Sequence, residues 1–194
     1  MTQGGLAAVL IAGWAATATA SAEAPPWLAE AVRLGSTKTK LEPYAAPGLA
    51  VTYTTPFLRV ARAANSAVRA GRTYAVADVE AKAYAPELRL LVGVRAVSAG
   101  DRLLGVAAPK SVRLTVGAGE IKASRIDPGV AKQTVTVGSG APVEVSGALL
   151  KAVFEIMGPP PRGGELEIRY GWAHDGRDEE IVERVPLDFQ KTRW

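Results

Sequence analysis

The 194-residue sequence contains no cysteine and only one histidine, His174. The absence of cysteine excludes disulfides, thiolate metal ligands and thiol nucleophiles. One histidine is too few for a common zinc site, which needs three or four nitrogen, sulfur or oxygen ligands in fixed geometry. We therefore predict a fold without covalent cross-links and a protein that uses neither a metal ion nor a cofactor.

Motifs of the common catalytic sites are missing too. The sequence has no G-x-S-x-G, so a Ser-His-Asp triad would depend on His174, which lies in a polar turn at residues 174–179. No glycine-rich phosphate loop occurs, because Gly117-Ala118-Gly119 precedes neither a helix nor a Lys-Ser/Thr pair. We predict a protein that is not an enzyme, and a hydrolase centred on the His174 hairpin is the alternative.

Long apolar runs are also rare, and the clearest one lies at the start of the chain. Residues 6–20 are uncharged and rich in alanine, and Ala20-Ser21-Ala22 is a small-x-small site for signal peptidase. This pattern is typical of a secretory signal peptide, although the first residues contain no lysine or arginine. The run of about 15 residues is shorter than the roughly 20 that span a bilayer. We predict cleavage after Ala22, a secreted or periplasmic location and no transmembrane span in the mature chain; a retained anchor is the alternative.

The net charge of +4 is concentrated in one region. Residues 59–113 contain eight arginines and two lysines against four acidic residues. Alanine and glycine are abundant and arginine outnumbers lysine, which predicts a bacterial source with a GC-rich genome, and the signal peptide then predicts the envelope or periplasm. A basic region on such a protein predicts an acidic glycan, a lipid headgroup or an acidic envelope protein as partner. We expect no nucleic acid partner, because a secreted protein does not meet one.

The clearest helix signal in the sequence spans residues 55–71, TPFLRVARAANSAVRAG. Thr55 suits the N-cap, Pro56 the first helical position and Gly71 the left-handed residue that ends a helix. At 100° per residue, one helix face is apolar: Phe57, Val60, Ala61, Ala64 and Val68. The other face carries the three candidate ligand-binding residues, Arg59, Arg62 and Arg69. Guanidinium groups are planar, bidentate donors suited to carboxylate or phosphate.

Most of the remaining sequence has the period-2 alternation of strands, interrupted by turn signals. It predicts a mainly β protein, an antiparallel β-sandwich of about eight strands that is loosely immunoglobulin-like. Shorter helices are expected at residues 26–35 and 73–84, and the Phe57/Val60/Val68 face is expected to pack on the sandwich. A strand at residues 103–106 should end before Pro109. Residues 127–129, DPG, should form a turn.

The last strand, residues 181–189, has two irregular positions. Glu183 lies on the same side as the apolar residues, which predicts a bulge or a strand end. Pro186 predicts that this strand lies at a sheet edge.

These signals predict a signal peptide at residues 1–22, a lead-in or linker at 23–47 and a single sandwich domain at 48–194. The helical region, residues 55–84, would be an insertion into this domain. The leading functional hypothesis is a non-catalytic binding or structural module of a bacterial cell envelope. A further alternative is a periplasmic chaperone or assembly subunit that pairs a strand, for example residues 165–172, with a partner.

Overall fold

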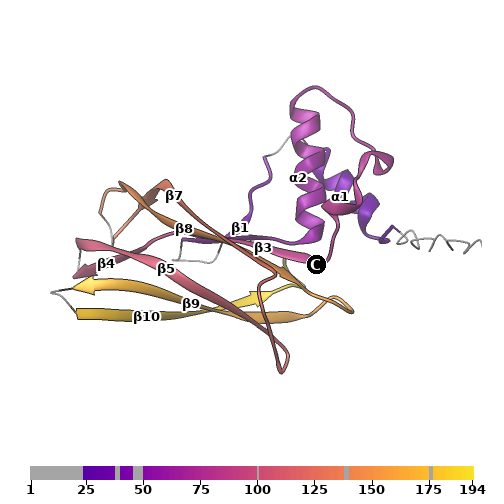
Figure 1. Ribbon diagram of the computed structural model, residues 1–194. Coiled ribbons are helices and arrows are strands. Elements are labelled where there is room, and N and C mark those ends of the chain that lie inside the picture. Colours follow the sequence, from indigo (N-terminus) through magenta and orange to yellow (C-terminus); the bar gives the residue numbers. More distant parts are fainter. Residues whose placement is uncertain (1–23, 38–39, 46–49, 100, 138–139, 175–176) are drawn as a thin grey trace, which may run out of the picture.

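The protein is a sandwich of two antiparallel sheets with helices standing at one end (Figure 1). The computed structural model describes residues 24–37, 40–45, 50–99, 101–137, 140–174 and 177–194, with residues 172–174 and 177–179 described by their backbone only. The predicted signal peptide lies outside these ranges. The predicted mainly β, antiparallel sandwich is confirmed, with ten strands in the described ranges where the sequence indicated about eight.

The first sheet has the strand order β1-β2-β3-β8-β7. Its strands are β1 (Tyr44–Ala45), β2 (Val51–Thr54), β3 (Glu87–Val92), β7 (Arg125–Val135) and β8 (Val143–Glu155). The second sheet has the order β10-β9-β5-β4, and β6 pairs with β5 beside it. Its strands are β4 (Arg95–Ala99), β5 (Arg102–Val116), β6 (Gly119–Ile121), β9 (Gly163–His174) and β10 (Arg177–Asp188).

The core between the sheets is built from alternate residues of the strands. The period-2 pattern predicts the inward positions of two segments, residues 150–156 and 166–172. Those within the described side chains are buried: Leu150, Ala152, Phe154, Ile156, Leu166, Ile168 and Tyr170. The side chain of Trp172, also predicted to face inward, lies outside them. The buried positions pack with buried residues of β2, β3, β5 and β10 in one continuous cluster. The period-2 pattern therefore identified the buried faces correctly, because successive side chains of a strand point to opposite sides.

The helix predicted at residues 55–71 is α2 (Pro56–Arg69). The Thr55 hydroxyl accepts a hydrogen bond from the backbone N–H of Leu58 at 3.3 Å, as an N-cap does. Gly71 has φ 74°, the left-handed conformation that glycine adopts without strain. The helix predicted at residues 26–35 is α1 (Leu28–Gly35).

Residues 73–84 form two short 3-10 helices, η1 (Val76–Asp78) and η2 (Ala81–Ala83), where one regular helix was predicted. The carboxylate of Asp78 accepts a hydrogen bond from the N–H of Ala75 at 2.7 Å, which closes a single turn. The carbonyl of Ala83 accepts from the side chain of Arg59. A local side-chain bond and one from α2 thus hold this segment in place of the backbone bonds of a continuous helix.

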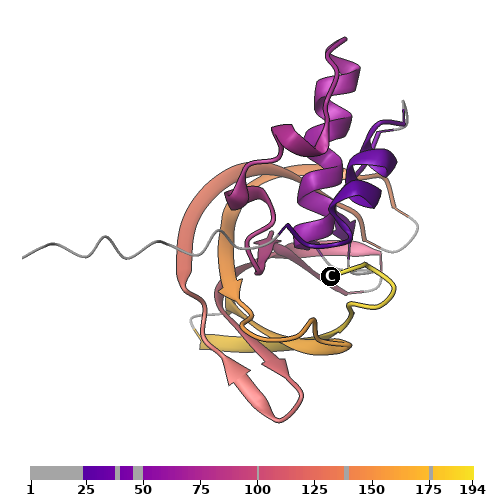
Figure 2. The same ribbon diagram turned by 90° about the vertical axis from the view of Figure 1, so that its right-hand side faces the viewer.

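The apolar face of α2 packs against α1, which corrects the expectation that it covers the sandwich. The two helices share a separate buried cluster: Leu28, Ala31, Val32, Phe57, Val60, Ala61 and Ala64. Val68 is only half-buried. The contact is close at Gly35, where a Cβ would lie 2.1 Å from the carbonyl oxygen of Ala61. Figures 1 and 2 show the helix pair projecting from the end of the sandwich.

Two proline positions differ from the predictions. β5 continues through Pro109, and its register with β9 shifts between Pro109 and Ser111. Pro128 and Gly129 lie inside β7, not in a turn. Within the described ranges, β7 pairs only with β8, so Pro128 is at a sheet edge where its missing N–H is tolerated.

In β10 the predicted bulge at Glu183 is absent, and the ladder with β9 runs unbroken from Arg177 to Asp188. The carboxylate of Glu183 points inward and forms an ion pair with Arg95, which is why the strand needs no irregularity there. Pro186 lies in a strand at the edge of its sheet, as predicted.

Candidate functional site

The three arginines of α2 have different surroundings, and Arg59, which is half-buried, makes the most contacts with the backbone. Its side chain donates to three backbone carbonyls: Nε to Ala83 at 3.1 Å, Nη2 to Ala85 at 2.5 Å and Nη1 to Glu87 at 2.5 Å. Burial lowers the pKa of Arg59 to about 10, so the guanidinium stays charged at neutral pH. Arg59 holds the segment between η2 and β3 against α2, and three of its nitrogens already have backbone partners.

Arg62 is half-buried and Arg69 is exposed. Within the described ranges, neither guanidinium donates a hydrogen bond or forms an ion pair. They lie seven positions apart, which places them about 10 Å apart along the helix axis on the same face. Their N–H donors are therefore available to a ligand.

Two hollows lie on either side of Arg62. The first has a volume of about 400 Å³ and is lined by Thr54, Arg59, Arg62, Lys82, Ala83 and Arg89. The second has a volume of about 420 Å³ and is lined by Lys40, Leu41, Arg62, Asn65, Ser66, Arg69 and Ala70. We call the surface formed by the cations Lys40, Arg62, Arg69, Lys82 and Arg89 the basic face.

Three cations of the basic face have acidic neighbours. Lys40 lies 2.5 Å from Glu42, Lys82 lies 2.6 Å from Glu80, and Arg89 lies 2.8 Å from Glu87. The hydrogen bond from Lys40 lowers the pKa of Glu42 below its usual range, and the charges of Arg62 and Arg69 lower it further. The three acidic residues neutralise three of the five cations of the basic face. The positive charges of Arg62 and Arg69 remain, and these two groups can bind two anionic groups about two helical turns apart.

The sequence indicated only part of this surface. Lys82 and Arg89 fall within the region of basic excess at residues 59–113, but Lys40 lies in a segment interpreted as a linker. Lys40 precedes β1, Lys82 lies in η2 and Arg89 in β3. Only the folded chain brings these elements around Arg62.

The other sequence-based candidates have less support. The side chain of His174 lies outside the described residues, so the hydrolase hypothesis stays a hypothesis. The strand proposed for pairing with a partner, residues 165–172, lies in β9, which has β10 on one side and β5 on the other. That segment therefore has no free edge.

No helix of the described ranges is long and apolar enough to cross a membrane. The chain matches no known protein-family model, and comparisons with curated proteins and with solved structures found no significant match.

Proposed function

We propose that the protein is a secreted or periplasmic, non-catalytic binding module of a bacterial cell envelope, and that its basic face holds an acidic glycan. The observation that supports this proposal is the pair Arg62 and Arg69, two guanidinium groups with no ion-pair partner in the described ranges. Each lines a hollow, and Arg62 lines both. Guanidinium groups bind carboxylates and phosphates by paired, charge-assisted hydrogen bonds.

The geometry favours a glycan over a lipid surface. A helix that binds a membrane surface inserts its apolar face among the lipids, and the apolar face of α2 is covered by α1. The two hollows fall in the size range of small-molecule sites, about 300–1,000 Å³. A glycan with repeated acidic groups can place one such group at each hollow.

Strand pairing with a partner is less favoured. β7 and β10 are long edge strands, and each contains a proline, Pro128 and Pro186. Proline removes a backbone donor from an edge and hinders pairing with another chain.

The proposal predicts that Arg62→Gln/Arg69→Gln weakens binding to polygalacturonate oligomers by about tenfold, because two charge-assisted contacts of about 0.7 kcal/mol each are lost. Isothermal titration calorimetry at low ionic strength measures this change, since added salt screens exposed charges. Arg59 is left intact, because its side chain holds backbone carbonyls.

The matched control is Arg102→Gln/Arg113→Gln, which removes the same charge from exposed positions of β5 in the other sheet. The control should bind like the original chain. An equal loss in both double variants would show general charge attraction and contradict a site at the basic face. Binding to vesicles that contain phosphatidylglycerol, without binding to the oligomers, would contradict the glycan.

A further inference from the structure

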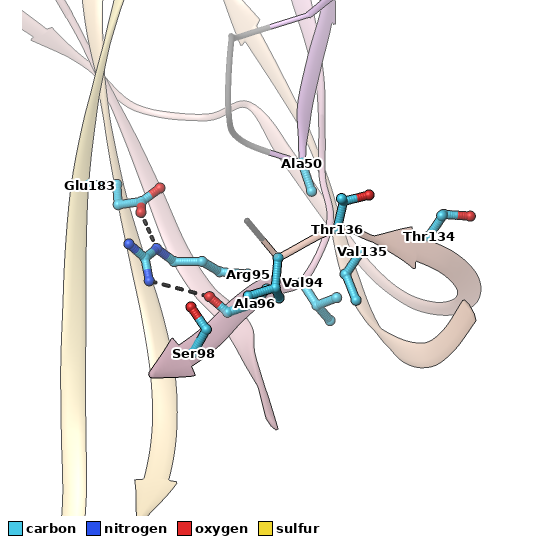
Figure 3. Close-up of a pocket in the computed structure, with 10 residues that line it drawn as sticks. Ala50, Val94, Arg95, Ala96, Ser98, Thr134, Val135, Thr136 and Glu183 are labelled. Carbon is cyan, nitrogen blue, oxygen red and sulfur yellow. Dashed lines mark hydrogen bonds and ion pairs between the residues drawn. The ribbon is translucent and has the colours of Figure 1, made fainter. Parts of the chain in front are cut away.

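A further pocket, of about 410 Å³, lies between the two sheets (Figure 3). It is lined by residues in or next to the start of β2, the start of β4, the end of β7 and the middle of β10: Ala50, Val94, Arg95, Ala96, Ser98, Thr134, Val135, Thr136, Val137 and Glu183. This pocket shares no residue with the basic face.

One wall of the pocket is the ion pair between Arg95 of β4 and Glu183 of β10 (Figure 3). These strands are separated by β5 and β9 in the sheet, a spacing of about 14 Å if the sheet were flat. The side chains meet because the sheet is curved, as Figure 2 shows. The side chain of Glu183 is only 12% exposed, so its charge is largely desolvated.

Part of the hydrogen-bonding capacity at this wall is unused. The Oε2 atom of Glu183 and the hydroxyl of Tyr170 are buried, and neither has a hydrogen-bond partner among the described residues. A buried polar atom without a partner costs about 1–3 kcal/mol. Well-packed apolar residues would stabilise the fold as much as a buried ion pair does. The presence of Arg95, Glu183 and Tyr170 at this wall is therefore not explained by stability alone.

The pocket presents donors and acceptors in balance. Arg95 supplies N–H donors, Glu183 and the carbonyl of Ala96 supply acceptors, and the Ser98 hydroxyl supplies both. Besides its pairing with Glu183 through Nε, Arg95 donates from Nη1 to the carbonyl of Ala96, and this bond is long at 3.5 Å. The charges of Arg95 and Glu183 cancel, so the pair gives an anionic or a cationic ligand no net electrostatic attraction.

From this balance we infer that the pocket binds a neutral, polyhydroxylated small molecule of the size of one sugar unit. Hydroxyl groups both donate and accept, so one accepts from the outer nitrogens of Arg95 while another donates to the hydroxyl of Ser98. Thr134 and Thr136 line the exposed side of the pocket.

The test is a titration of the ¹⁵N-labelled chain with glucose, galactose and N-acetylglucosamine, followed by NMR, with gluconate and glucosamine as charged comparators. At least one neutral sugar should shift the amides of Ala96, Ser98 and Thr136 saturably and more tightly than either charged compound. No saturable shift up to about 10 mM, or tighter binding of a charged compound, would overturn the inference.

Two variants locate the site. Ser98→Trp changes an exposed lining residue beside Arg95, so it leaves the core intact and should weaken sugar binding at least tenfold by blocking the pocket (Figure 3). Thr115→Trp, at an exposed position of β5 away from the pocket, is its control and should bind normally. Arg95→Lys keeps the positive charge but removes the planar guanidinium group with its several N–H donors. This variant should also bind the sugar at least tenfold more weakly. Unchanged affinity in folded Ser98→Trp would place the sugar elsewhere and refute the assignment.

Discussion

At the scale of single residues, the arginines of α2 show that residues of the same type on one helix can have different roles. Arg59 and Arg62 are three positions apart and both carry a guanidinium. Arg59 bonds three carbonyls of the segment that leads into β3, whereas Arg62 has no ion-pair partner in the described ranges and lies between two hollows. The first is a structural residue, and the second is available to a ligand.

We expect Arg59→Gln to lower the free energy of unfolding by about 2–4 kcal/mol, because hydrogen bonds from a charged group are lost and their acceptors are left unpaired. Urea denaturation followed by circular dichroism measures the change. Arg62→Gln is the control and should stay within about 0.5 kcal/mol, as substitutions at the surface usually do. Similar losses in both variants would refute the different roles.

At the scale of secondary-structure elements, the outer face of β9 and β10 carries a group of alternating charges. Arg169 donates to Glu167 of its own strand at 3.0 Å and to Glu180 of β10 at 2.9 Å. Arg184 of β10 lies 3.5 Å from Glu167. The hydrogen bond from Arg169 lowers the pKa of Glu167, and the charge of Arg184 lowers it further.

This lowered pKa predicts a pH-dependent contribution to stability. The Glu167 carboxylate is favoured in the folded state, so its contribution is present above the pKa of the unfolded chain, about 4.3, and is lost as the pH falls through the folded pKa. Glu167→Gln should therefore lower the urea midpoint at pH 7 and have little effect below about pH 3. Glu120→Gln, at an exposed position of β6, is the control and should leave the midpoint unchanged at both pH values. A Glu167→Gln effect that persists at low pH would contradict the electrostatic origin.

At the scale of the whole molecule, the sandwich and the helix pair have separate buried clusters. The end of β10 and the residues after it connect them. The hydroxyl of Thr55 donates to the carbonyl of Thr192 at 3.4 Å, and Arg193 lies 2.6 Å from Glu30 of α1 and 5.1 Å from the ring centre of Phe57 in α2. Trp194 packs edge-on against Phe189, with ring centres 5.1 Å apart.

We predict that Arg193→Ala loosens the helix pair more than the sandwich. Loss of the ion pair and of the cation–π contact should speed amide hydrogen exchange in α1 and α2 by about fivefold. Exchange in β8 and β9 should change little, because these strands belong to the other cluster. Lys191→Ala, at an exposed position nearby, is the control. Equal acceleration in both parts of the molecule would show that they unfold as one unit.

The sequence by itself determined the local features of this protein. The cap at Thr55, the left-handed Gly71 and the inward faces of β8 and β9 depend on residues only a few positions apart, so their patterns are visible without a fold. Arg62 and Arg69 were candidates for the same reason. The mainly β class followed from the period-2 alternation of the strands.

Only the tertiary structure decided what these elements meet. It placed α1 on the apolar face of α2, bonded Arg59 to carbonyls 24–28 positions away and brought Glu183 to Arg95 across 88 positions. It also placed Pro128 in an edge strand, where the turn signal of residues 127–129 is overridden. Such contacts depend on burial and chain topology, which no short window of sequence contains, because the partners come from segments far apart in the chain.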